Sequence, residues 1–295
     1  MKTTEHKRKQ QGHLEYASCD DFQPEQIEQV DQMLMHHSTP LGLDGKFAGS
    51  GTFIRCHKLH GILTARHVIE RFDFTIDSRQ VLSISVMDGR PHEYSLDMCT
   101  LQCVKVGRPK RSNPRAGPDL AVIVLPDVVA KNISYRKNFH DLSVHRRERL
   151  KEAKRPAGLW CAFGFPQEQV DVQVSDPKST MIHCVGLLLL TTVTRRRGVR
   201  GFDYLHLAVG CEKLRGKVPP PRKYKGMSGS GVWQIPIVAD AKGHPRIQIE
   251  KALLAGVVFF ETRQAGQSKE LRCHGPKSLY VKVRNALIRR AKPRH

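Results

Sequence analysis

The chain has 295 residues, which is enough for one large domain or two ordinary ones. Its hydrophobic fraction of 39%, counted without its 23 glycines, is normal for a soluble globular protein. The longest apolar run, near residues 185–190, is too short to cross a bilayer, so a membrane-spanning protein is excluded. The net charge of +21 favours an anionic partner or high solubility and carries no information about fold.

The N-terminal stretch predicts a basic extension with one short helix over residues 1–44. The first ten residues are charged, but no apolar segment follows them, so we do not expect a secretory signal. Ile27, Val30 and Leu34 recur at helical spacing within residues 21–37, after Pro24 in the first turn. Residues 38–45 are rich in turn formers and are expected to end this element.

Short runs of apolar or alternating residues, typical of strands, occur both before and after the basic stretch at residues 146–158. In the first half they occupy residues 47–54, 62–68, 79–87, 101–106 and 120–125, and a basic, proline-broken loop at 108–115 precedes the last of them. No strand pattern appears over 127–155, and residues 146–158 are interpreted as a basic linker or solvated helix. In the second half the runs occupy residues 159–166, 170–174, 181–193, 202–209 and 247–260.

The closing segment, residues 278–291, predicts an amphipathic helix because four apolar residues share one face. With the strand pattern, this predicts an all-β fold of two antiparallel six-stranded-type β-barrels. The first barrel would cover residues 45–145 and the second residues 159–295, including the helix. The active site would lie between them.

Residues 226–233 read GMSGSGVW, a serine between glycines that runs into an apolar strand. A serine hydroxyl needs a base to take its proton, and the anion that it creates on a carbonyl needs donors already in place. A tight turn of small residues can expose the Ser228 hydroxyl and leave the backbone N–H groups of Gly226 and Ser228 free to bind that anion. The alternative is a plain glycine-serine turn between strands.

Two further blocks lie upstream of the serine. Residues 64–68 read TARHV after an apolar strand, and residues 117–123 read GPDLAVI at the start of another. His, then Asp, then Ser is a known chain order for a catalytic triad. His67 would act as general base and later as general acid, and Asp119 would fix its tautomer. The alternatives are an ordinary surface histidine and a turn aspartate after proline.

Together the three blocks resemble those of the trypsin-like (chymotrypsin-fold) serine peptidases, over roughly residues 45–290. TARHV is similar to the TAAHC or TAGHV block, GPDLAVI to DIALL or DLAVL, and GMSGSGVW to GxSGGP. The resemblance implies an endopeptidase that works through an acyl-enzyme intermediate, without metal or cofactor. It assigns the triad to His67, Asp119 and Ser228 and the oxyanion hole to the backbone of Gly226 and Ser228. Ser230 replaces the usual second glycine and competes as nucleophile, but the family pattern selects Ser228.

The resemblance also places a substrate pocket. Arg222, six residues before the nucleophile, takes the position that lines the specificity pocket, and Phe259, Phe260 and Glu261 match the strand that pairs with substrate. Trypsin-like preference for basic residues needs an aspartate where Arg222 stands, so that preference is not expected. Arg222 either favours an acidic side chain of the substrate or pairs with Glu261, and the sequence leaves both open.

Eight cysteines could form four disulfides, but reduced thiols are the better interpretation. Val68 follows His67 where secreted members of the family carry a cysteine, and no export signal is recognised, so we expect a cytoplasmic protein. Cys99 and Cys103 lack the second pair of ligands that a zinc site needs.

Two rivals to a peptidase remain: a non-catalytic binding module on a protease fold, and a basic nucleic-acid-binding protein. Basic clusters occupy residues 108–115, 146–155, 195–200 and 289–294, but none carries an RNA-binding or helix-turn-helix signature. We expect mostly solvated surface there. The expected partner is a protein or peptide substrate, with an acidic protein or nucleic acid as further options and no membrane.

Overall fold

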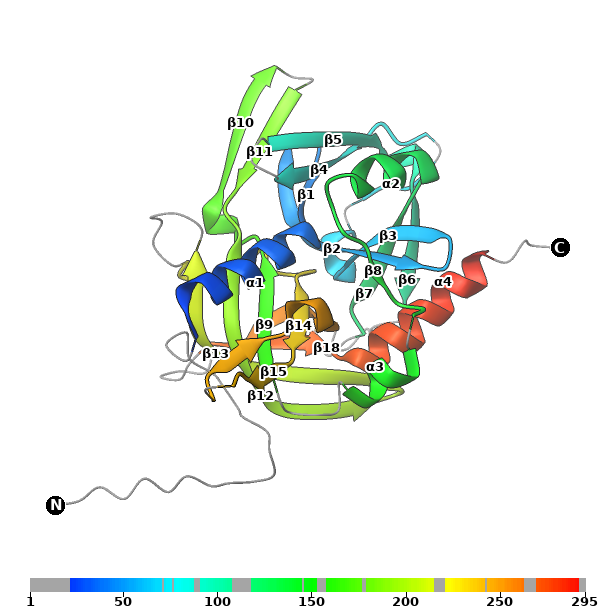
Figure 1. Cartoon of the computed structure of the whole chain (residues 1–295). Coiled ribbons are helices and arrows are strands. Elements are labelled where there is room, and N and C mark those ends of the chain that lie inside the picture. The colour runs from blue at the N-terminus through cyan, green and yellow to red at the C-terminus, as the bar shows by residue number, and fades with distance from the viewer. Residues whose placement is uncertain are drawn as a thin grey trace.

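The computed structural model describes residues 22–70, 72–75, 77–87, 91–107, 118–144, 146–152, 158–176, 179–214, 221–241, 243–262 and 269–291 (Figure 1). Its helices are α1 (Pro24–His36), α2 (Asp127–Ser134), α3 (Arg146–Glu152) and α4 (Arg284–Ala291), with a π-helical segment η7 (Ser278–Val283) directly before α4. Short 3-10 turns are η2 (Arg66–Val68), η3 (Met98–Thr100), η5 (Gln167–Gln169) and η6 (Ile249–Lys251). Among these helices none is both long and apolar enough to span a membrane.

The first half of the chain folds into an eight-stranded sheet. Its strands are β1 (Ser38–Leu43), β2 (Lys46–Cys56), β3 (Leu59–Thr64), β4 (Val81–Met87), β5 (Pro91–Asp97), β6 (Gln102–Val106), β7 (Leu120–Leu125) and β8 (His140–Asp141). They pair in the order β5-β4-β1-β2-β3-β7-β6, and β8 pairs in parallel with β2. In the described residues β5 and β6 remain the two edges, so this unit is an open half-barrel, and only one of the two predicted barrels is closed.

The second half contains a closed six-stranded barrel. Its strands, in the order in which they pair, are β12 (Leu187–Val199), β13 (Phe202–Leu214), β18 (Glu270–His274), β17 (Leu253–Thr262), β14 (Gly231–Ile235) and β9 (Leu159–Gly164). Two separate hairpins accompany it: β10 (Val170–Asp176) with β11 (Ser179–Cys184), and β15 (Ile237–Ala239) with β16 (Pro245–Ile247). The mostly β fold and the second barrel confirm that part of the prediction.

The two faces of the barrel strands serve two cores, because side chains alternate along a strand. In β9, Trp160 and Ala162 belong to a cluster contributed by all six barrel strands. Their neighbours Cys161 and Phe163 belong to a larger cluster that also contains residues of the first sheet and of α1. The sheet and the barrel are therefore joined by one continuous apolar core.

Helix α1 belongs to that core, although the sequence places it in an extension. Ile27, Val30 and Leu34, the residues at helical spacing, are almost completely buried. At the other end of the chain, Tyr280 and Leu287 are buried in the same cluster. The predicted closing helix is thus present, but it begins as the π-helical segment η7.

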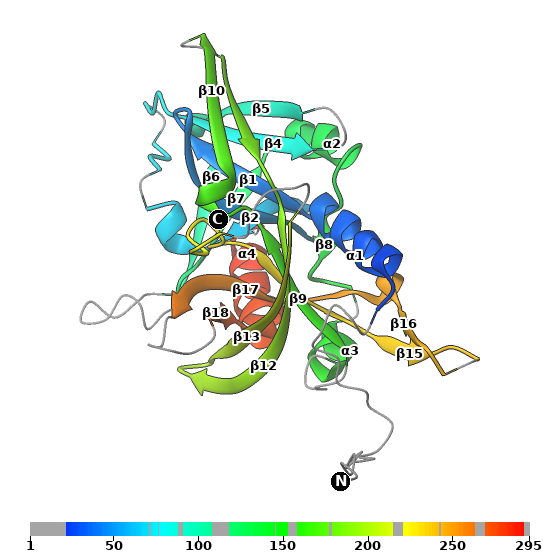
Figure 2. The same ribbon diagram turned by 90° about the vertical axis from the view of Figure 1, so that its left-hand side faces the viewer.

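Several elements differ from the sequence prediction. The turn-rich stretch after α1 forms β1, and α2, β5 and β18 occur where no such element is expected. The run over 181–193 divides into parts of β11 and β12, which continue beyond it on both sides. The hairpin β10–β11 projects from the body of the molecule in two perpendicular views (Figures 1 and 2). The 108–115 loop and residues 1–20 lie outside the described residues.

Candidate active site

His67 and Asp119 lie side by side at the ends of two paired strands. Strand β3 ends at Thr64, which is paired with Ala121 near the start of β7. The turn η2 and the residues before β7 therefore meet at the same end of this strand pair. The Nδ1 atom of His67 lies 2.6 Å from Oδ2 of Asp119, and the backbone N–H of His67 donates to Oδ1 at 2.9 Å. Both carboxylate oxygens are therefore held by the same residue.

This contact sets the tautomer of His67. The carboxylate accepts a proton-bearing nitrogen, so Nδ1 carries the hydrogen and the lone pair of the neutral ring is on Nε2. The His67 side chain is 45% exposed, whereas that of Asp119 is 14% exposed. The pair therefore offers an accessible base backed by a largely buried carboxylate.

The serine block forms a tight turn between the two halves of the molecule. Gly226 and Gly229 have φ values of +96° and +95°, which only glycine adopts without strain. The turn is closed by two backbone hydrogen bonds, from Met227 to Tyr224 and from Ser230 to Met227, both 3.0 Å long. The Met227 side chain is fully buried in the barrel, so it anchors the turn.

The structure separates the two competing serines. Ser230 is fully buried; its hydroxyl lies 3.8 Å from the sulfur of Met227, and a Cβ on Gly164 would lie 1.7 Å from that hydroxyl oxygen. Ser228 is only partly buried. Ser228 is therefore the more accessible of the two serines, while Ser230 packs against the interior.

Strand β2 of the first sheet holds this turn in place. The N–H of Ser50 donates to the carbonyl of Ser228 at 3.0 Å, and its hydroxyl donates to the carbonyl of Gly226 at 2.8 Å. Thr52 donates to the carbonyl of Gly229 at 3.1 Å, and Thr64 donates to the carbonyl of Ser50 at 2.8 Å. Ser50 thus connects the end of β3, which leads to His67, with the serine turn.

The histidine turn and the serine turn lie against the same glycine. A Cβ on Gly49 would lie 3.0 Å from a methyl carbon of Val68 and 3.2 Å from the carbonyl oxygen of Ser228. Val68, the residue beside His67, and Ser228 are therefore both close neighbours of Gly49. Among the described residues no hydrogen bond joins the Ser228 hydroxyl to His67.

The two expected anion-binding N–H groups have no acceptor among the described residues. The carbonyl of Lys225 accepts from Gln167, and the carbonyl of Met227 accepts from Ser230. In a trans peptide the N–H points opposite to the C=O, so the N–H groups of Gly226 and Ser228 point away from those partners. They are available as donors.

The predicted substrate-pocket residues do not all lie on an open wall. Phe259 is 2% exposed and its ring packs 4.7 Å from that of His274, so its side chain faces the interior. The expected role of Phe259 in pairing with substrate concerns its backbone, so it stays a prediction. Phe260 and Glu261 are partly exposed, and Glu261 accepts the N–H of Tyr224 at 3.0 Å. Arg222 is exposed.

Carboxylates brace the loop in front of the serine turn. Glu168 accepts the backbone N–H groups of Arg222, at 2.7 Å, and Lys223, at 3.2 Å. Behind it the Tyr224 hydroxyl donates to Glu212, and the ammonium group of Lys269 lies 4.4 Å from the centre of the Tyr224 ring. Burial and the Glu212 carboxylate raise the pKa of Tyr224, so its hydroxyl stays a donor.

The described cysteines are free thiols: Cys56, Cys99, Cys103, Cys161, Cys184 and Cys273. Burial raises the pKa of Cys103 to about 11 and that of Cys184 to about 12, so both stay protonated and unreactive at neutral pH. No group of three or more His, Cys, Asp or Glu side chains among the described residues is arranged to hold a metal ion.

The sequence prediction missed the residues that position the site. Ser50 and Thr52 stand in the glycine-rich strand 47–54, whose glycines do indicate a close backbone approach, but nothing local assigns the hydroxyls to the serine turn. His274 of β18 accepts the N–H of Asp119 at 3.0 Å. The sequence does not predict this contact between His274 and Asp119 either, because it does not predict strand β18.

The fold and the site together define a mostly β protein in which an open sheet supplies a His–Asp pair and a closed barrel supplies a serine turn. No family model and no curated protein matches the chain. A search of solved structures finds a similarity to one from work on how aromatic interactions drive the coupled folding and binding of the intrinsically disordered Sesbania mosaic virus VPg protein. The identity is 12%, the TM-score 0.41, and the match covers 84% of this chain and 90% of that one. At that level the likeness says nothing further about this protein.

Proposed function

We propose that the protein is a serine endopeptidase of the trypsin-like type, with Ser228 as nucleophile, His67 as general base and Asp119 as the group that orients His67. The observation that carries the proposal is the His67–Asp119 pair, whose neighbour Val68 lies against Gly49 together with the carbonyl of the partly buried Ser228. The three sequence blocks, in their order along the chain, support it.

The chemistry follows from the tautomer. The Ser228 hydroxyl loses its proton to Nε2 of His67 as its oxygen forms a bond to the substrate carbonyl carbon. Asp119 stabilises the imidazolium that results. His67 then returns the proton to the leaving nitrogen as the C–N bond breaks, which leaves an ester on Ser228. Water hydrolyses that ester by the same proton transfers.

The free N–H groups of Gly226 and Ser228 supply the second requirement. The carbonyl oxygen becomes an anion when the serine adds, and fixed donors stabilise it without reorganisation. Loss of one such donor typically lowers kcat by about 10²–10³-fold. The proposed mechanism therefore uses no metal or cofactor. The proposed substrate, a protein or peptide, follows from the resemblance of the three sequence blocks.

Labelling with a fluorophosphonate probe, followed by peptide hydrolysis, tests this proposal. The wild-type protein should label on one serine, and Ser228→Ala should abolish labelling and hydrolysis, because loss of a triad nucleophile typically costs on the order of 10⁶-fold in kcat. The matched variant Ser230→Ala should still label. A Ser228→Ala protein that keeps labelling would refute the assignment of the nucleophile.

One observation favours a second candidate, a non-catalytic binding module on the same fold. The Ser228 hydroxyl is not hydrogen-bonded to His67 in the described residues, and such a bond is the usual activating contact. These bonds are often long until substrate binds, so we favour the enzyme. A wild-type protein that folds but neither labels nor cleaves peptides would establish the binding module instead.

A further inference from the structure

A buried histidine from the barrel contacts Asp119 from behind. His274 is the last residue of β18, where it pairs with Tyr204 of β13 and Val257 of β17. It is 0% exposed, and its Nε2 atom accepts the backbone N–H of Asp119 at 3.0 Å. The two residues come from different halves of the molecule, so this bond crosses the junction between sheet and barrel.

The contact fixes the state of the ring. Because Nε2 accepts a hydrogen bond, it carries the lone pair, and the proton of the neutral imidazole is on Nδ1. The ring lies among aromatic side chains, 4.7 Å from Phe259, 5.0 Å from Tyr204 and 6.1 Å from Phe202. Burial in this cluster lowers the pKa of His274 to about 3, with the nearby Arg272 acting in the same direction and Asp119 against it.

The other ring nitrogen is not satisfied. Nδ1 of His274 is buried and has no hydrogen-bond partner among the described residues. A buried N–H without a partner destabilises the fold, so an apolar residue would suit this aromatic cluster better. The stability of the core therefore does not explain the histidine, whereas its contact with Asp119 does.

We propose that His274 is a positioning residue for the candidate site, an inference that rests on the proposed peptidase function. Its Nε2 atom fixes the backbone at Asp119, and that backbone sets the direction of the carboxylate that holds His67. Because β18 and the serine turn belong to the same barrel half, the bond also sets the His–Asp pair relative to Ser228. Displacement of a catalytic group by about 1 Å can cost on the order of 10²-fold in rate.

The experiment compares His274→Gln with His274→Met. A glutamine side chain can place its amide oxygen where Nε2 stands and so keeps an acceptor for Asp119. Methionine fills the space with a terminal methyl group and only a weakly accepting sulfur. The rate of fluorophosphonate labelling should fall about 10–100-fold in His274→Met and stay within about threefold of wild type in His274→Gln. Cys273→Ala, which changes the neighbouring buried residue on the opposite face of β18, is the matched control and should label normally.

A second readout does not depend on activity. The Nδ1 proton of His67, which Asp119 accepts, should give a strongly downfield NMR signal in the wild type and in His274→Gln. In His274→Met the signal should move or exchange, while the melting temperature stays near that of the wild type. Equal labelling rates and an unchanged His67 signal in a folded His274→Met protein would overturn the inference. If the wild type does not label at all, the peptidase proposal fails, and the NMR comparison alone still tests the positioning role.

Discussion

At the scale of single residues, the candidate site depends on glycines that no other residue can replace. Gly229 has a φ of +95°, and a Cβ there would lie 1.8 Å from the carbonyl oxygen of Ser50, which is rigid backbone. The same oxygen accepts the Thr64 hydroxyl, so it cannot move without disturbing the strand that leads to His67. The backbones of the serine turn and β2 are thus in such close contact that no side chain fits at Gly229.

We therefore expect Gly229→Ala to lower the free energy of unfolding by at least about 3 kcal/mol, since backbone strain and a steric clash add. Gly243 offers a control, because its φ is +82° but nothing lies within 4 Å of the Cβ that would be added. Gly243→Ala should cost only the strain, about 1 kcal/mol. Urea denaturation of both variants measures the difference, and equal losses would show that crowding at Ser50 is unimportant.

At the scale of elements, α1 packs against the core and is not a separate N-terminal extension. Leu34 is 0% exposed and belongs to the cluster that joins sheet and barrel, whereas Gln32 on the same helix is exposed. The amphipathic pattern of α1 predicts this burial, but the sequence does not tell which sheet the helix covers. The side-chain amide of Gln26 in this helix also donates a hydrogen bond to the carbonyl of Pro245 in β16.

Leu34→Ala should lower the free energy of unfolding by about 2–5 kcal/mol, the usual cost of removing a fully buried leucine. The comparison is Gln32→Ala, which should stay within about 0.5 kcal/mol of wild type because that side chain is exposed. Thermal or urea denaturation monitored by circular dichroism gives both values. If Leu34→Ala unfolds like the wild type, α1 contributes little to the core.

The sequence predicts the elements that carry the motifs better than those that position them. Strand β3 before His67, strand β7 after Asp119 and the first barrel strand β9 lie close to their expected ranges. Apolar runs bounded by turns are strong local signals. Strand β1 was expected to be a turn because it contains Pro40 and Gly42; its pairing with β2 and β4 overrides that preference. His274 acts on a residue 155 positions away, and no local pattern reports such a contact.

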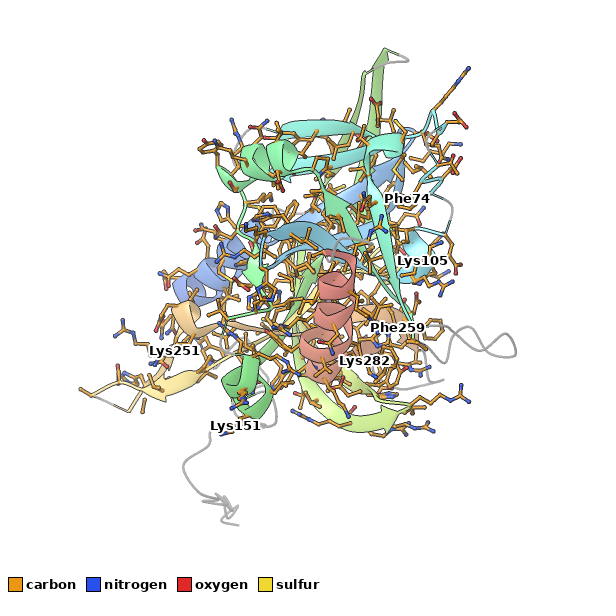
Figure 3. The ribbon with its side chains drawn as sticks, turned by 90° about the vertical axis from the view of Figure 1, so that its right-hand side faces the viewer. Phe74, Lys105, Lys151, Lys251, Phe259 and Lys282 are labelled. Atoms are coloured by element: carbon orange, nitrogen blue, oxygen red, sulfur yellow. The ribbon has the colours of Figure 1, made fainter. Side chains whose placement is uncertain are left out.

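At the scale of the whole molecule, the positive charge is spread over several faces. The lysines labelled in Figure 3 lie far apart, from Lys105 on β6 to Lys151 and Lys251 on the opposite side of that view. On the barrel, four arginines at the end of the β12–β13 hairpin are exposed: Arg195, Arg196, Arg197 and Arg200. The 108–115 cluster and the last residues of the 289–294 cluster lie outside the described part. This spread is consistent with a solvated surface.

Two buried histidines, His140 and His274, and the partly buried His37 make the fold sensitive to acid. Burial lowers the pKa of His37 to about 4 and that of His274 to about 3, and it also lowers the pKa of His140 well below its usual range. In the unfolded chain each of these histidines would have a pKa of about 6.5. Between these limits the unfolded state binds more protons than the folded state, so stability increases with pH over that range and is lost as the pH falls.

The free energy of unfolding should therefore decrease between pH 7 and pH 4, by up to about 1.4 kcal/mol per pH unit for each histidine. Urea denaturation at pH 7, 6 and 5 measures this slope before most carboxylates titrate. His140→Phe removes one of the three groups and should make the slope shallower by about one proton. An identical slope in that variant would mean that His140 is not neutral in the folded protein.

The hydrogen bonds from Ser50 and Thr52 to the serine turn also determine how late in synthesis the candidate site can form. They join residues 176 and 177 positions apart, and β2 leaves the ribosome long before its partner does. At about 5–20 residues per second, the wait is on the order of ten seconds or more. A nascent chain contains His67 and Asp119 early, but Ser228 and His274, on which the proposed site also depends, are made only with the second half. If the chain is the peptidase proposed above, it cannot cleave other unfolded chains before its own second half has folded.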